Sequence, residues 1–186
     1  MIFFLPTIIS DVIEVTVFKN FISTYGPLYQ FVLHVFGVEM PVLLGDATTA
    51  TPTILFYVLW SGFGTAVLIF TGVMNRIPED ILEAAKLDGA TWSVEFSKIV
   101  IPLTWETLYT MIVLGLSGIF MASGPIMVFT GGAYNTYTLS YWLFSLVQNG
   151  TYNYSAAVSL IFSIITIPIV FISRWIMSKF SPDVSY

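Results

Sequence analysis

The sequence predicts an all-α membrane protein, and three observations support this fold class. Of its 186 residues, 56% are hydrophobic and only 9% are charged, whereas about a quarter of the residues in a soluble domain are charged. Four apolar stretches are long enough, or nearly so, to cross ~30 Å of hydrocarbon as helices. One polar, helix-forming segment separates the second stretch from the third. We therefore expect about four transmembrane helices, one helix–turn–helix on the membrane surface and short interfacial helices.

The four expected spans are long apolar runs, and the second and third contain small residues that allow close helix packing. They cover Met1–Phe18, Thr51–Val73, Leu108–Phe129 and Ala156–Met177. Pro125 should kink or end the third span near its far side. The first span is marginal in length and begins inside an apolar run without a charged flank, so we expect a partial transmembrane domain whose upstream spans are missing.

The basic residues predict the orientation. Arg76, Lys86 and Lys98 lie between the second and third spans, and Arg174 and Lys179 lie at the end of the fourth, whereas the other connections hold only Lys19. By the positive-inside rule, the segment between the second and third spans and the C-terminus are cytoplasmic. Segments 20–50 and 130–154 then lie outside, the first with a short interfacial helix after the Gly26-Pro27 turn.

Composition excludes several classes of function. The net charge of −5 leaves no basic patch for nucleic acid. The chain has no cysteine and one histidine, His34, so neither a thiol nucleophile nor a His-rich metal site is expected. No G-x-x-x-x-G-K phosphate loop occurs, which excludes an ATPase. The spans show no catalytic constellation, so an enzyme is not expected.

Two acidic residues in the first span, Asp11 and Glu14, are three positions apart and therefore share a helical face. Carboxylates at bilayer depth could mark a polar translocation path. Because this pair lies near the outer end of a marginal span, we favour a position at or near the outer interface.

The polar segment between the second and third spans has strong helix signals. Pro78 suits a first turn, where Glu79 and Asp80 complement the positive end of the helix dipole. Asp88-Gly89 should end this helix, since glycine readily adopts the left-handed conformation. A second helix should follow, with Trp92, Phe96 and Ile99 on one face before Pro102 leads into the third span.

This segment resembles the EAA loop of type I ABC importer permeases. The residues that match the pattern, and to which the resemblance assigns ATPase coupling, are Glu83, Ala84, Ala85, Asp88, Gly89, Ala90, Phe96, Ile99 and Pro102. The stretches "YVLWSGFGTAVLIFTGVMNRIPED" and "FTGGAYNTYTLSYWLFSLVQNGTYNYSAAVSLI" also resemble carbohydrate-uptake permeases of the maltose/glycerol-phosphate type. Gly131-Gly132-Ala133 departs from the family's Gly-Gly-Pro turn.

The resemblance implies a subunit without chemistry of its own in a bacterial or archaeal plasma (inner) membrane. It would bind no cofactor, and ATP would be used by separate ATPase subunits that receive the coupling loop, residues 75–104. Further implied partners are a second permease subunit, an external solute-binding protein, a sugar or oligosaccharide and membrane lipid. Residues 1–186 as a whole would form the partial transmembrane domain, and the coupling loop would lie within it.

A sugar path needs polar groups and aromatic faces on a mostly apolar wall. The candidates by location are Trp60, Ser61, Gly62, Thr65, Ala122 and Ser123. Helix packing explains the small residues equally well. A sugar or oligosaccharide is the favoured cargo, and another small solute (an amino acid, a polyamine or phosphate) is the alternative. A secondary transporter is a further alternative, although midplane charges and paired broken helices are not evident.

Overall fold

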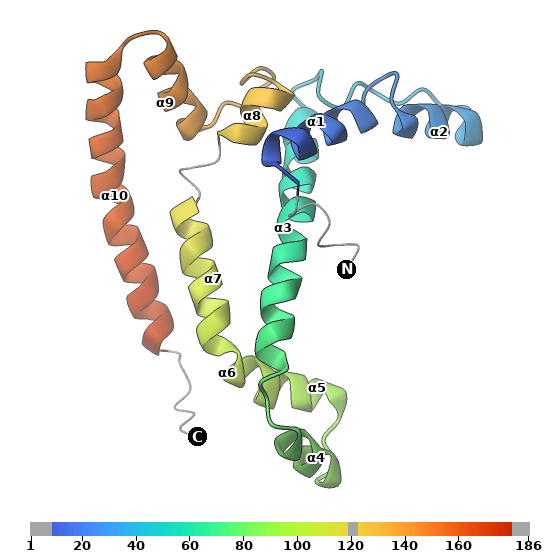
Figure 1. Cartoon of the computed structure of the whole chain (residues 1–186), viewed down its shortest axis with the longest axis vertical. Helices are drawn as coiled ribbons and strands as arrows, with labels where there is room; N and C mark the ends of the chain where they lie inside the picture. The colour runs from blue at the N-terminus through green and yellow to red at the C-terminus, as the bar shows by residue number, and fades with distance from the viewer. Residues whose placement is uncertain (1–8, 119–122, 180–186) are drawn as a thin grey trace. The chain divides into compact units, whose positions relative to one another are not determined.

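The computed structural model describes residues 9–118 and 123–179, and every regular element in these ranges is a helix (Figure 1). The chain divides into two compact units. The first unit comprises Met1–Thr65 and Phe120–Leu160, and the second comprises Ala66–Ile119 and Ile161–Tyr186. Two long helices, α3 (Ala50–Met74) and α10 (Tyr152–Lys179), contribute to both units.

The two long helices confirm two of the expected spans. Both α3 and α10 are long and apolar enough to cross a membrane. Their 25 and 28 residues exceed the ~20 residues that a crossing requires. The expected spans Thr51–Val73 and Ala156–Met177 lie entirely within them.

The third expected span differs from the prediction. Helix α7 (Trp105–Gly118) forms its first part, and α8 (Gly124–Phe129) is a separate short helix. Pro125 is at the start of α8 instead of kinking a continuous span, because the first helical turn needs no N–H from this position. Among the described residues, a third crossing requires joining the helical segments Trp92–Leu103 and Trp105–Leu116, which are bent by 66°.

The first unit is built around α1 (Asp11–Phe21), which packs against α8 (Figure 1). Residues 1–8 of the expected first span lie outside the described residues, and the eleven residues of α1 extend only about 17 Å. The expected interfacial helix is α2 (Pro27–Phe36). Helix α9 (Leu139–Gln148) precedes α10, and the Ser155 hydroxyl donates to the Leu143 carbonyl at 3.4 Å.

An aromatic cluster holds the core of the first unit together. Phe129 on α8 contacts Tyr57 on α3 edge-to-face, with ring centroids 4.9 Å apart. Phe18 on α1 lies 5.0 Å from Tyr57 and 5.9 Å from Phe129. Tyr57 and Phe129 are both buried. The Lys19 ammonium of α1 also donates a hydrogen bond to the Val128 carbonyl of α8 at 2.6 Å.

The second unit contains the helical hairpin expected between the second and third spans. Helix α4 (Glu79–Leu87) is followed by α5 (Trp92–Glu95), a π-helical turn (Phe96–Val100) and α6 (Ile101–Leu103), which leads into α7 (Figure 1). Trp105 of α7 donates its indole N–H to the Met177 carbonyl of α10 at 3.4 Å. This bond ties the start of α7 to the end of α10.

Candidate functional site

The turn of the hairpin is fixed by backbone hydrogen bonds. The amide of Ala90 donates to the Ala85 carbonyl at 2.9 Å, and the amide of Gly89 donates to the Lys86 carbonyl at 3.1 Å. Gly89 has a φ of +77°. These features define a Schellman motif, in which a left-handed residue ends the helix and its last carbonyls are satisfied.

Position 89 requires glycine because of its backbone conformation, and not because a larger side chain would clash. A Cβ atom at this position would meet no atom within 4 Å, but a left-handed backbone costs an L-residue about 1–2 kcal/mol. The predicted helix end at Asp88-Gly89 is thereby confirmed. The Schellman motif spans the six residues Ala85–Ala90.

Large apolar side chains at the tip of the hairpin are exposed. Leu87 is 89% exposed and Trp92 is 77% exposed. The Trp92 ring stacks on Phe96, with centroids 5.5 Å apart and planes 10° apart. We call Leu87, Trp92 and Phe96 the tip patch. Since exposed apolar groups gathered beside polar ones are typical of interaction surfaces, the tip patch is the candidate contact surface of the hairpin.

The structure brings the predicted coupling residues together on this one hairpin. Glu83, Ala84, Asp88 and Gly89 are exposed, whereas Ala85, Ala90, Ile99 and Pro102 are half-buried. Leu87 and Trp92 are exposed contact candidates absent from the sequence-based set. Their signal was a large apolar residue on each side of the polar turn. The coupling role itself stays a prediction.

The second helix of the hairpin is irregular at Pro102. The Ile101 amide donates to the Phe96 carbonyl, an i to i+5 bond of the π-helical turn. Pro102 has no N–H, so it cannot donate the usual hydrogen bond to the carbonyl four residues earlier. Single π-helical turns of this kind interrupt α-helices. The bend of 66° follows at Thr104, whose buried hydroxyl donates to the Val100 carbonyl at 2.8 Å.

The predicted path residues lie at several places in the described part of the chain, and their role stays a prediction. Trp60 stacks on Phe18 with a centroid separation of 6.0 Å, and Ser61 lies beside the Tyr57 hydroxyl. Gly62 and Thr65 are exposed elsewhere on α3. Ser123 immediately precedes α8, and Ala122 lies outside the described residues. Trp60 and Ser61 are the two predicted path residues that adjoin the aromatic cluster.

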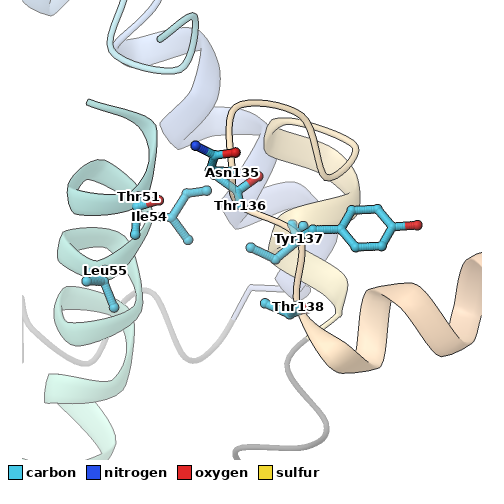
Figure 2. Close-up of a pocket in the computed structure, with 8 residues that line it drawn as sticks. Thr51, Ile54, Leu55, Asn135, Thr136, Tyr137 and Thr138 are labelled. Carbon is cyan, nitrogen blue, oxygen red and sulfur yellow. The ribbon is translucent and has the colours of Figure 1, made fainter. Parts of the chain in front are cut away.

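A small pocket in the first unit was not predicted from the sequence. Its volume is about 180 Å³, and its lining residues are Thr51, Ile54, Leu55, Ile126, Asn135, Thr136, Tyr137 and Thr138. Figure 2 shows Asn135 and Thr136 beside the first turns of α3, whereas the Tyr137 ring points away. The pocket is smaller than the ~300 Å³ at which small-molecule sites begin, so it could hold only part of a ligand. The pocket forms because residues 135–138 lie beside α3 in the folded chain although they are far from it in the sequence.

Glu14 has the most unusual environment of the predicted candidates. The structure separates the two carboxylates of α1, because Asp11 is exposed and Glu14 is only 7% exposed. The Glu14 Oε1 atom is enclosed and accepts no hydrogen bond from the described residues. The Tyr57 hydroxyl is its polar neighbour. A buried polar atom without a partner is rare and costly.

Comparisons with known proteins agree with this architecture. The chain is 28% identical over 171 residues to the probable ABC transporter permease protein YurN of Bacillus subtilis (strain 168), covering 89% of this chain and 59% of YurN. It is 30% identical to the multiple sugar-binding transport system permease protein MsmF of Streptococcus mutans serotype c (strain ATCC 700610 / UA159), covering 88% and 57%. The chain thus spans little more than half the length of these relatives.

A solved structure shares the fold. A chain of a bacterial ABC transporter involved in the import of the acidic polysaccharide alginate superposes with a TM-score of 0.87 at 21% identity, covering 96% of this chain and 64% of that chain. The family model described as "Binding-protein-dependent transport system inner membrane component" matches residues 1–186. The chain therefore belongs to the family of binding-protein-dependent transport system inner membrane components.

Proposed function

We propose that this chain is a permease subunit of a binding-protein-dependent ABC importer and carries a sugar or oligosaccharide. The observation that carries this proposal is the family match along residues 1–186. The cargo class is supported by relatives whose names specify sugars, such as MsmF and the galactooligosaccharides transport system permease protein GanP of Bacillus subtilis (strain 168). Membership of a transport family also argues against a catalytic role for the chain itself.

The hairpin is proposed to couple this subunit to a separate ATPase. Two backbone hydrogen bonds close its turn at Gly89, and its tip patch offers apolar surface to a partner. Residues 75–104 would be the coupling loop within a partial transmembrane domain. The remaining partners are a second permease subunit, an external binding protein and membrane lipid, and neither ATP nor another cofactor would bind this chain.

The orientation is proposed from charge. Five of the six basic residues belong to the second unit, and only Lys19 belongs to the first. By the positive-inside rule, the hairpin and the C-terminus are cytoplasmic, and the start of α3 at Ala50 is outside. The 25 residues of α3 extend about 37 Å, which is long enough to cross the ~30 Å hydrocarbon layer between these two sides.

The test is uptake by the complete importer reconstituted in liposomes with its partner subunits and binding protein. Wild-type importer should accumulate a neutral oligosaccharide only when ATP is supplied. Gly89→Pro should abolish uptake while leaving the chain in the membrane, because proline fixes φ near −65° and cannot adopt +77°. Normal uptake by this variant would contradict coupling through the hairpin, and uptake of another solute class alone would contradict the sugar assignment.

A further inference from the structure

One oxygen of the buried Glu14 carboxylate, Oε1, has no hydrogen-bond donor among the described residues, although the Tyr57 hydroxyl interacts with this carboxylate. Its Oε1 atom is enclosed without a partner, although burying an unpaired charged group carries a large free-energy cost. Glu14 lies in the first turn of α1, where the helix dipole favours a negative charge. The dipole supplies no donor to Oε1, however, so it does not account for the burial.

The surroundings of Glu14 have the composition of a saccharide contact. An ionised carboxylate only accepts hydrogen bonds, and sugar hydroxyls can donate them. Phe18, one turn after Glu14 on α1, contacts the Tyr57 ring of α3, and Trp60, which stacks on Phe18, is 38% exposed at the edge of the cluster. Aromatic faces with a few placed polar groups are typical of small-molecule sites.

The charges of the first unit oppose an acidic cargo. Its sequence holds four acidic residues, Asp11, Glu14, Glu39 and Asp46, and one basic residue, Lys19. The Lys19 ammonium is already bonded to the Val128 carbonyl. Recognition of a carboxylate or phosphate relies on arginine or lysine, so this unit is poorly equipped to bind a uronate or a sugar phosphate.

We propose that Glu14 contacts the cargo, that its carboxylate accepts hydrogen bonds from the hydroxyls of an uncharged saccharide, and that this part of the permease disfavours acidic saccharides. The inference rests on the proposed function as a sugar permease. Because Glu14 is enclosed in the present conformation, the contact requires α1 to move from α3 during transport, as in other rigid-body transitions of packed helices. Trp60 would supply the aromatic face at the accessible edge.

The experiment uses the complete reconstituted importer and compares a malto-oligosaccharide, a galacto-oligosaccharide and an oligouronate. Wild type should take up at least one neutral oligosaccharide and no oligouronate. Glu14→Gln should lower the rate of neutral uptake about tenfold, the effect of losing one hydrogen bond to a charged group. The matched variant Glu39→Gln, at an exposed position of the same unit, should transport normally.

The outcomes separate this inference from the proposed function. Wild type that takes up no saccharide would contradict the sugar function itself. Uptake of the oligouronate at the neutral rate would overturn the inference and leave the sugar function intact, and so would normal neutral uptake by Glu14→Gln. If Glu14→Gln does not assemble, Trp60→Ala provides the test, because this half-exposed residue can be truncated with less effect on packing. A raised KM for neutral cargo supports the contact, and an unchanged KM overturns it.

Discussion

The Ala90 amide donates to the Ala85 carbonyl across the turn of the hairpin at a distance of 2.9 Å. In this turn the bond forms with the intervening residue Gly89 in the left-handed conformation, as in a Schellman motif. It sets the direction in which the chain leaves α4 and thereby the position of Trp92 at the tip. The spacing from Ala85 to Ala90 is therefore a geometric requirement of the hairpin.

The first prediction concerns this turn. Gly89→Ala should destabilise the hairpin by about 1 kcal/mol, because alanine is disfavoured at positive φ, and should reduce cargo-stimulated ATP hydrolysis of the reconstituted importer. Gly37→Ala is the matched control, since Gly37 also ends a helix at φ +66° and a Cβ added there would meet no atom within 4 Å. Equal losses of coupling in the two variants would show that strain anywhere in the chain has this effect, and would contradict a special role for the hairpin.

The hairpin was predictable from sequence because its signals are local. Pro78, the acidic first turn and Gly89 each act on the backbone within a few residues, and the structure starts and ends α4 beside them. The long apolar runs of α3 and α10 were predictable for the same reason. The bend at Thr104 was not, because proline alone does not specify whether a helix kinks, ends or forms a π-helical turn.

The candidate sites of the first unit were not predictable, because they depend on tertiary packing. Periodicity placed Asp11 and Glu14 on one face, but only the packing of α1 against its neighbours buries one and exposes the other. Trp60 was selected by its location, yet its pairing with Phe18 joins residues 42 positions apart along the chain. The pocket of residues 135–138 likewise needs the loop to reach α3.

The second prediction tests the orientation. The chain contains no cysteine, so single cysteines can be introduced without background labelling. Ala47→Cys lies in an exposed segment of the first unit. It should react with a membrane-impermeant maleimide added to spheroplasts, whose plasma membrane is intact and accessible from outside. Ser93→Cys, exposed in the hairpin, should react only after the membrane is permeabilised. The reverse pattern would invert the proposed topology.

The third prediction concerns the aromatic cluster. Phe129→Ala should destabilise the first unit by about 3 kcal/mol, because Phe129 is only 4% exposed and truncating a buried phenylalanine leaves a cavity. The detergent-solubilised importer should then melt at a lower temperature. Phe171→Ala, at a position 66% exposed, is the control and should melt close to wild type. A Phe129→Ala variant with unchanged melting would contradict the importance of this core.

The measurement that tests the central claim most directly is co-purification of the ATPase with variants of the tip patch. Affinity-tagged importer would be isolated from detergent-solubilised native membranes, and its partners identified by mass spectrometry. Trp92→Ala should reduce recovery of a protein with a G-x-x-x-x-G-K phosphate loop, because it removes exposed apolar surface from the hairpin. Tyr25→Ala truncates a side chain that is 93% exposed in the other unit and should recover the ATPase at the wild-type level. Wild-type preparations without such an ATPase, or equal recovery with Trp92→Ala, would contradict coupling through the hairpin.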